Sequence, residues 1–382
     1  MSPATARRNV KNPFPPEQGI LYIDAPVIAG IEPAPLWHPS SRHIRRHGRL
    51  SEPTGLNGPV RITTNPDDAA EALVAGHLAA LPTETVYGLG ARADLPHAIA
   101  RVYAAKGRPA DHPLIVHIRD HAELGAWARE IPGYAHDLAR ACWPGPLTLV
   151  LARTEKAGDF ITGGQGTVAV RVPSHPLMRT VLDRLAGFTA DPAVGIAAPS
   201  ANRFGRVSPT TVGHVEVELG LILGPDDVLL DGGPSSVGVE STIVDCTGPL
   251  PVILRPGNVS ADDVTTATGL ALGASSAVRA PGTLASHYAP QARVTLVDAA
   301  TLESTPGDDA TTGVLALAGI PTPIGLVRLS EPATADEYAQ VLYAALREAD
   351  ALGLQRVLAV PPPVHGVGAA VIDRLRRAST PA

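Results

Sequence analysis

The segment Pro82-Thr-Glu-Thr-Val-Tyr-Gly-Leu-Gly90 follows the apolar stretch 78–81 and indicates the fold class of this chain. A short apolar run that ends in Pro-Thr-Glu-Thr is typical of a strand leading into a loop. The hydroxyls and the carboxylate of that loop can orient a small polar ligand, and Gly88 and Gly90 predict a close backbone turn after it. Open α/β sheets bind ligands at strand ends, so the segment predicts one wall of a ligand site.

Helical and apolar segments alternate on both sides of this loop. Asn65-Pro66-Asp67-Asp68 has the order of a helix start, with a capping Asn, Pro at the first helical position and acids in the first turn. A second helix is predicted from Pro96 to Lys106, with Gly107 as its stop. Further strands are predicted at residues 114–118, 147–151, 168–172, 195–198, 228–230 and 242–244, and helices at 175–185 and 212–221. This alternation predicts an α/β domain around a twisted sheet.

The remainder of the chain has a second, smaller α/β pattern. Residues 259–290 are rich in Gly, Ala and Ser and predict a long linker. Thr334-Ala-Asp-Glu337 has the spacing of a capping box and opens a helix. Strands are predicted at 293–297, 314–318, 325–329 and 356–360, and a last helix at 369–378. We therefore expect an N-terminal extension (1–58), a larger α/β domain (59–258), the linker (259–290) and a small C-terminal βαβ Rossmann-like domain (291–382).

Composition excludes several classes of protein. The 382 residues are 45% hydrophobic and 18% charged, as in globular proteins. The net charge of −6 argues against tight non-specific binding of nucleic acid by the whole surface. No apolar run reaches the roughly 18 residues that span a membrane, and no secretory signal is evident, so we expect a cytoplasmic protein. The basic stretch Ser41-Arg-His-Ile-Arg-Arg-His-Gly-Arg49 is consistent with contact to RNA or with a solvated tail.

Loops at the ends of the predicted strands carry polar and cationic groups. Lys106 and Arg108, two residues apart, suit a polyphosphate, with Lys as a point charge and Arg as a forked donor, although a helix C-terminus attracts basic residues in any case. Arg171 and Arg255 stand at two further strand ends. Neither a Walker A loop nor GxGxxG after a strand is present, and no Cys or acid cluster beside the histidines predicts a metal site.

These segments, in this order, resemble the YrdC-like family, and specifically its long, two-domain threonylcarbamoyl-AMP synthases. The matching segments are Pro82 to Gly90, Lys106 to Pro109, Pro113-Leu-Ile-Val-His117, Trp143-Pro-Gly-Pro-Leu-Thr148, Val170-Arg-Val-Pro173, Pro199-Ser-Ala-Asn202, Gly238-Val-Glu-Ser-Thr-Ile-Val-Asp245, Arg255-Pro-Gly257, Pro281-Gly282, His287-Tyr-Ala-Pro290 and Gly366-Val-Gly-Ala-Ala-Val-Ile-Asp-Arg-Leu375. The resemblance covers residues 62 to 378. It implies a twisted, open, mixed sheet with flanking helices in the larger domain.

The resemblance also implies an activity and a set of site residues. The family condenses L-threonine, bicarbonate or CO2, and ATP to threonylcarbamoyl-AMP and pyrophosphate, and Mg²⁺ is expected with ATP. A separate transferase complex then moves the threonylcarbamoyl group to the adenosine beside the anticodon of tRNA. The resemblance assigns catalysis to Lys106 and Arg108. It assigns ATP binding to Lys106, Arg108, His112, Thr167, Ser200, Asn202, Ser208, Arg255 and Tyr288, and threonine binding to Thr85, His117, Arg171, Ala198 and Ser241.

Three departures from the family pattern and two alternatives accompany this hypothesis. His112 stands where the family commonly has Asn, Ala285-Ser286 replaces a basic residue common before His-Tyr-Ala-Pro, and the extension before Ile62 has no counterpart.

The first alternative is a module that binds RNA, weakly or as its main role, without catalysis. The second is the carbamoyl-transfer domain of hydrogenase maturation, whose zinc-finger segment would require Cys-x-x-Cys, which this chain lacks.

Overall fold

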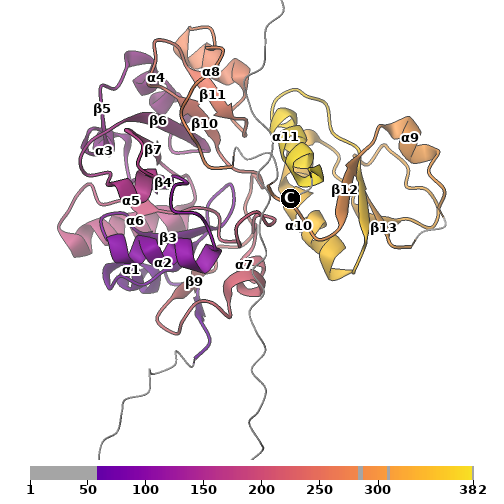
Figure 1. The fold of residues 1–382 in the computed structure, drawn as a ribbon, viewed down its shortest axis with the longest axis horizontal. Coiled ribbons are helices and arrows are strands. Elements are labelled where there is room, and N and C mark those ends of the chain that lie inside the picture. Colours follow the sequence, from indigo (N-terminus) through magenta and orange to yellow (C-terminus); the bar gives the residue numbers. More distant parts are fainter. Residues whose placement is uncertain (1–57, 283–286, 308–309, 381–382) are drawn as a thin grey trace, which may run out of the picture. The chain divides into compact units, whose positions relative to one another are not determined.

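A large mixed sheet forms the first part of the fold (Figure 1). The computed structural model describes residues 58–282, 287–307 and 310–380, so the predicted extension, its basic stretch and Ala285-Ser286 lie outside the described residues. The sheet strands are β1 (Arg61–Thr63), β2 (Ala79–Leu81), β3 (Gly88–Arg92), β4 (Ile115–His117), β5 (Ala128–Arg129), β6 (Leu147–Arg153), β7 (Thr167–Arg171), β8 (Ile196–Ala197), β9 (Val228–Leu230), β10 (Thr242–Asp245) and β11 (Val252–Arg255).

The pairing of these strands confirms the predicted open mixed sheet. Their order is β1-β9-β2-β3-β8-β4-β7-β6-β10-β11, with β5 attached to β6. Pairs β1–β9, β9–β2, β4–β7 and β6–β10 are parallel, and β2–β3, β3–β8, β8–β4, β7–β6 and β10–β11 are antiparallel. The flanking helices are α1 (Pro66–Val74), α2 (Pro96–Lys106), η1 (His121–Glu123), α3 (Leu124–Trp127), α4 (Gly133–Cys142), α5 (Asp159–Thr162), α6 (Pro176–Thr189), α7 (Val212–Leu219) and α8 (Ala261–Thr268).

Local signals in the sequence explain where the first helices begin and end. The Asn65 side chain accepts from the backbone N–H of Asp67 and caps α1, as predicted. Gly107 ends α2 in the left-handed conformation, with φ of 62°, which a glycine adopts without steric cost. Because α2 ends there, Lys106 and Arg108 lie at the point where the helix passes into a loop.

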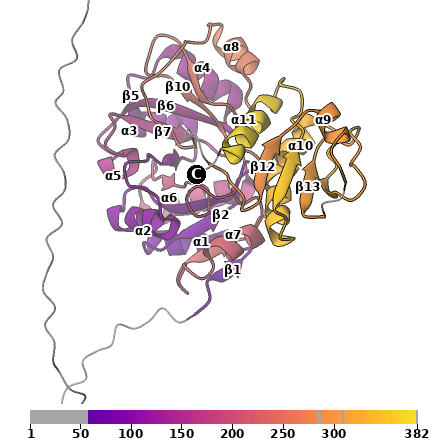
Figure 2. The same ribbon diagram turned by 45° about the vertical axis from the view of Figure 1, so that its right-hand side comes forward.

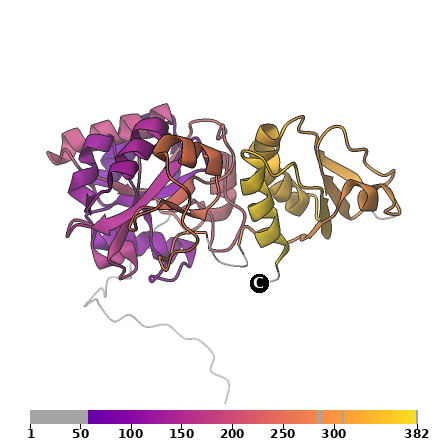
Figure 3. The same cartoon turned by 90° about the horizontal axis from the view of Figure 1, so that it is seen from above.

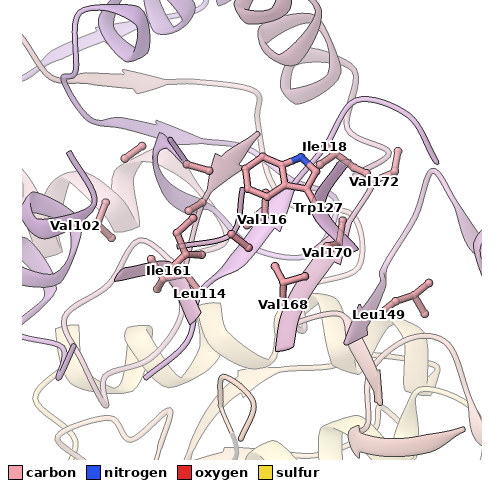
Figure 4. Close-up of a cluster of buried hydrophobic side chains, with 14 of the residues drawn as sticks. Val102, Leu114, Val116, Ile118, Trp127, Leu149, Ile161, Val168, Val170 and Val172 are labelled. Carbon is pink, nitrogen blue, oxygen red and sulfur yellow. The ribbon is translucent and has the colours of Figure 1, made fainter. Parts of the chain in front are cut away.

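Both faces of the sheet are buried, and alternate residues of one strand enter different clusters. In β7, Val168 and Val170 join a core cluster with α2 and α4, and Figure 4 shows them among its other side chains. Ala169 lies on the opposite face, where it packs with Ile115 and with Ala280 of the segment after α8. Side chains alternate across a strand, so His117 and Arg171 belong to this second face.

A second, parallel sheet follows, in the order β12-β15-β13-β14 (Figures 1 and 2). Its elements are β12 (Arg293–Leu296), α9 (Ala299–Glu303), β13 (Thr312–Leu315), β14 (Val327–Ser330), α10 (Ala335–Ala351), β15 (Arg356–Ala359) and α11 (Gly368–Ser379), the last drawn in yellow in Figure 3. Thr334 accepts from the backbone N–H of Glu337 and caps α10. We call residues 292–380 the C-terminal lobe; the predicted domain boundaries themselves stay predictions.

Two local predictions were wrong. Gly88 and Gly90 do not form a turn but lie in β3, where a Cβ at Gly90 would come within 2.9 Å of both Leu81 and Ile196. These glycines allow neighbouring strands to pack closely, and neither adopts a left-handed backbone conformation. The predicted linker contains α8, whose capping box pairs Ser260 with Asp263 and whose Val264 is buried in the main core.

Among the described residues, none of the helices combines the length and apolar character needed to cross a membrane.

Candidate active site

A cleft lies on the second face of the large sheet, and polar and cationic side chains line it together with apolar ones. Strand ends, the loop after β8, and the segment around Tyr288 form its wall. The lining residues are Thr83, Thr85, Val86, Gly88, Arg108, Ile115, His117, Arg171, Ala198, Pro199, Ser200, Glu240, Ser241, Arg255, Pro281, Gly282, His287 and Tyr288. They include all five residues that the family resemblance assigns to threonine, and Arg108, Ser200, Arg255 and Tyr288 of those it assigns to ATP.

Arg171 is held in the wall by contacts from two loops, the one between β2 and β3 and the one between α4 and β6. Its Nη2 lies 2.7 Å from Oε1 of Glu84, and the two side chains are only 4% and 6% exposed. Its Nη1 donates to the hydroxyl of Thr85 at 3.0 Å, and its Nε donates to the carbonyl of Gly145 at 3.2 Å. Burial alone would raise the pKa of Glu84, but the charge of Arg171 and the hydrogen bonds to the carboxylate together outweigh burial, and the pKa is lowered. The pair therefore places a fixed guanidinium at the cleft.

His117 presents a neutral imidazole beside this guanidinium. It is buried, and burial together with the charge of Arg171 lowers its pKa to about 3. Its Nδ1 is buried without a hydrogen-bond partner in the described structure. A neutral imidazole with one unused nitrogen can donate to or accept from a ligand, according to its tautomer.

Arg108 and Arg255 bring two more cations to the same cleft. Arg108 donates through Nη2 to the carbonyl of Pro113 at 2.9 Å, while its Nε has no partner in the described structure. Burial lowers its pKa to about 10, so it is charged at neutral pH. Arg255 donates to the carbonyl of Ser241 at 2.9 Å and to that of Pro281 at 3.1 Å. Three buried guanidinium groups thus line one cavity.

Lys106 and Asn202 support the wall from behind. The Nζ of Lys106 donates to the carbonyls of Ser200 and Asn202, at 2.5 Å each. The side chain of Asn202 donates to the carbonyls of Arg203 and Arg206, at 2.8 Å each. Neither side chain lines the cleft. Their contacts instead shape the loop after β8 that presents Ser200.

The other three residues assigned to ATP also lie outside the cleft wall. His112 is half-buried and packs edge-on against Phe204, with ring centres 5.3 Å apart. Thr167 begins β7 and Arg171 ends it, so the two lie about 13 Å apart along an extended strand. Ser208 is fully buried and donates to Glu240 at 2.6 Å. Ser208 therefore reaches the cleft only through that carboxylate.

Tyr288 closes part of the cleft with a constrained backbone. It has a positive φ of 62° and is 1% exposed, and its hydroxyl has no partner in the described structure. A Cβ on Gly282 would lie 2.3 Å from that hydroxyl and 3.0 Å from a nitrogen of Arg255. Gly282 is thus required by this close approach. A buried tyrosine in the left-handed region is costly and is found where surrounding contacts impose it.

Glu240 is a lining residue that sequence reasoning did not select. It lies in the quoted segment Gly238 to Asp245, and an acid two residues before a buried strand was the available signal. Burial would raise its pKa, but the charges of Arg374 and Arg255 lower it to about 2. The carboxylate is therefore ionised, buried and paired.

Comparison with known proteins identifies relatives over most of the chain. Residues 71–257 match the family described as "Telomere recombination", and residues 252–380 match the family described as "Threonylcarbamoyl-AMP synthase, C-terminal domain". The chain is 39% identical to the threonylcarbamoyl-AMP synthase of Pyrococcus abyssi, over 81% of this chain and 93% of that one. It is 35% identical to the synthase of Bacillus subtilis, over 83% and 94%.

A solved structure gives a similar result. The crystal structure of Pyrococcus abyssi Sua5 complexed with L-threonine matches with a TM-score of 0.74 and 38% identity. The match covers 84% of this chain and 96% of that one. The similarity therefore includes both sheets.

Proposed function

This chain belongs to the threonylcarbamoyl-AMP synthase family of enzymes, and we propose that it condenses L-threonine, bicarbonate or CO2, and ATP to threonylcarbamoyl-AMP and pyrophosphate. The observation that carries the proposal is a single cleft lined by Arg108, Arg171 and Arg255. Its one lining carboxylate among the described residues, Glu240, is already paired with Arg374. A triphosphate and an amino-acid carboxylate are both anionic and need such cations.

Threonine is proposed to bind where Arg171 meets His117, Thr85 and Ser241. Its carboxylate would pair with the Arg171 guanidinium, which Glu84 and Gly145 already orient. The neutral His117 can bind the amine once that amine has lost a proton, and it adds no positive charge beside the amine. Ser241 and the backbone of Ala198 complete the contacts. A solved relative with L-threonine bound is consistent with this assignment.

ATP is proposed to bind along Arg108, Ser200, Arg255 and Tyr288. Lys106, Asn202 and Ser208 act there by shaping the wall, because the Lys106 ammonium, the Asn202 amide nitrogen and the Ser208 hydroxyl each bond to protein groups. His112 and Thr167 could reach ATP only beyond the lined cleft. Mg²⁺ would enter with ATP, held by phosphate oxygens and water, since the wall supplies no unpaired carboxylate from the described residues.

The chemistry has two bond-forming steps. Threonine and bicarbonate give the N-carbamate with release of water and a proton. A carbamate oxygen then bonds to the α-phosphorus, and the bond from that phosphorus to the oxygen bridging to the β-phosphorus breaks. Pyrophosphate leaves with the electron pair, and Arg108 and Arg255 are placed to stabilise its growing charge. Loss of one preorganised donor of this kind commonly costs about 100- to 1,000-fold in rate.

The product would serve a later tRNA modification. In this proposal a separate transferase complex in the cytoplasm moves the threonylcarbamoyl group to the adenosine next to the anticodon. The carbamate and its mixed anhydride react with water, so the cleft must be kept dry. The buried Tyr288 over the cleft serves that purpose.

One assay tests the proposal against its alternatives. Pure protein is incubated with ATP, Mg²⁺, threonine and labelled bicarbonate, and pyrophosphate and labelled adenylate are measured. Release of pyrophosphate that requires both threonine and bicarbonate is expected. A folded sample without this activity contradicts the proposal. Duplex RNA binding without turnover then favours the RNA module, and turnover of carbamoyl phosphate favours the carbamoyltransferase.

A further inference from the structure

The C-terminal lobe contributes two buried side chains to the carboxylate of Glu240. Arg374 of α11 donates through Nε to Oε2 at 2.8 Å, and Tyr343 of α10 donates through its hydroxyl to the same oxygen at 2.8 Å. The other oxygen, Oε1, accepts from Ser208. All four side chains are buried, Arg374 at 1% exposure and Tyr343 at 0%. Glu240 in the cleft wall is therefore held from the C-terminal lobe.

Arg374 also contacts other parts of the cleft wall. Its guanidinium lies 5.2 Å from the ring centre of Tyr288, and its Nη2 donates to the carbonyl of Pro256 at 3.0 Å. Pro256 directly follows Arg255, so this bond fixes the loop that carries the Arg255 guanidinium. Tyr343 stacks on Tyr288, with ring centres 5.7 Å apart and an interplanar angle of 28°. Tyr288 thus packs against two residues of the C-terminal lobe.

The surrounding backbone shows that this interface is closely packed. A Cβ on Gly238, two residues before Glu240, would lie 2.3 Å from the carbonyl of Ala339 in α10. Val86, Val207 and Val239 of the large-sheet region share one apolar cluster with Tyr288 and the C-terminal helices. A small displacement of α10 or α11 would therefore move groups at the cleft.

We propose that Arg374 and Tyr343 are positioning residues for ATP, which act through Glu240 and Tyr288 without touching substrate. The inference rests on the proposed function for the identity of the ligand. The groups that they hold are Ser208, Arg255 and Tyr288, which are assigned to ATP. Thr85 and Arg171, which are proposed to bind threonine, instead contact Thr83, Glu84 and Gly145. Of the residues assigned to threonine, Ser241 lies nearest to the C-terminal lobe's contacts, because it follows Glu240 and accepts from Arg255. ATP binding is thus sensitive to the C-terminal lobe, and threonine binding is much less so.

A matched pair of tyrosines allows a sharp test. Tyr343 and Tyr338 are both fully buried on α10, and each donates one hydrogen bond through its hydroxyl. Tyr338 donates to the carbonyl of Leu315 in the small sheet, away from Glu240. Tyr343→Phe and Tyr338→Phe therefore remove the same atom from similar surroundings. Only the first change weakens the support of Glu240.

We expect Tyr343→Phe to weaken binding of a non-hydrolysable ATP analogue roughly 5- to 20-fold by calorimetry, within the usual range of coupling between sites. Threonine affinity should change less than about 2-fold, and Tyr338→Phe should leave both affinities unchanged within the same limit. In turnover, the KM for ATP should rise with little change in kcat. Equal effects of the two variants, or an equal loss of threonine binding in Tyr343→Phe, would overturn the inference.

Arg374 provides a second test, with Arg376 of the same helix as control. Arg374→Met leaves the Glu240 charge buried without its cation, so this single variant is expected to fold poorly. The double variant Arg374→Met with Glu240→Gln removes both charges and should fold, yet still bind the ATP analogue at least about 5-fold more weakly. Arg376 is exposed, and Arg376→Met should match the wild type.

Because binding and turnover are both measured, failure of the proposed function can be distinguished from failure of the positioning inference. If the wild type binds the ATP analogue but releases no threonine-dependent pyrophosphate, the proposed function fails and the positioning inference is still measured by binding. If the wild type makes product and the double variant binds ATP normally, the inference fails and the proposed function stands.

Discussion

Replacing Arg171 with methionine removes the cation from a buried pair and leaves the Glu84 carboxylate behind. The two side chains are 4% and 6% exposed, so solvent screens them little, and loss of one partner should cost about 3–5 kcal/mol of unfolding free energy. Without Arg171, Glu84 keeps backbone hydrogen bonds but no cation; the N–H of Ser174 still donates to it at 3.2 Å. Since whole domains are stable by roughly 5–15 kcal/mol, this loss is large.

The assay is a double-mutant cycle in urea at pH 7.5. Arg171→Met and Glu84→Gln should each destabilise the protein, and the double variant should recover about 2–3 kcal/mol relative to the sum. Arg184→Met serves as the control, because Arg184 and Asp67 form an exposed pair that should contribute about 0–1 kcal/mol. The recovered double variant should remain inactive with threonine, because the substrate carboxylate still lacks its cation.

Two outcomes would refute this reasoning. Additive effects, with an interaction energy below about 0.5 kcal/mol, would mean that Glu84 does not stabilise the Arg171 charge. Near-normal threonine-dependent turnover in the double variant would remove Arg171 from the proposed threonine site.

Three further predictions concern the cleft and its surroundings. Arg108→Met should lower the rate of pyrophosphate release about 100-fold or more while the circular dichroism spectrum is kept, and near-normal release would exclude Arg108 from the reaction. His117 and His287 have their pKa lowered to about 3, chiefly by burial, so the unfolded chain takes up protons first as pH falls below about 6.5. Protonation of each histidine in the unfolded chain should then lower the free energy of unfolding by about 1.4 kcal/mol per pH unit between roughly pH 6.5 and pH 3. Equal urea midpoints at pH 7.5 and 5.5 would contradict this prediction. Gly90→Ala should lower the free energy of unfolding by about 1–3 kcal/mol, because the new methyl group meets Leu81 and Ile196. Gly107→Ala is the comparison for backbone strain alone, because Gly107 has a positive φ and open space where the methyl group would lie.

Some residues of the cleft could be predicted from the sequence around them. Others belong to the site only because of contacts with distant parts of the chain. Arg108 and Arg255 could be selected from the sequence because Arg108 follows the end of a helix and Arg255 ends a strand. Glu240 was not selected, because its one local signal, a position two residues before a buried strand, is shared by many solvated loop acids. Its partner Arg374 lies 134 residues further along the chain. Whether this acid is buried and paired depends on which helix packs against it in the tertiary structure.

The sequence by itself determined the helix caps at Asn65, Gly107 and Thr334 and the short apolar runs that form strands. These features depend on hydrogen bonds and side-chain directions within a few residues, so they can be read locally. Only the tertiary structure decided that Gly90 lies in a strand, that the helix at 261–268 packs into the main core, and that Arg171 pairs with Glu84. The strand position of Gly90 and the pairing of Arg171 depend on which strands become neighbours, and strand order is set by packing of the whole sheet rather than by any one segment. The helix at 261–268 has a local capping box at Ser260 and Asp263, and what the tertiary structure adds is the burial of its Val264 in the main core.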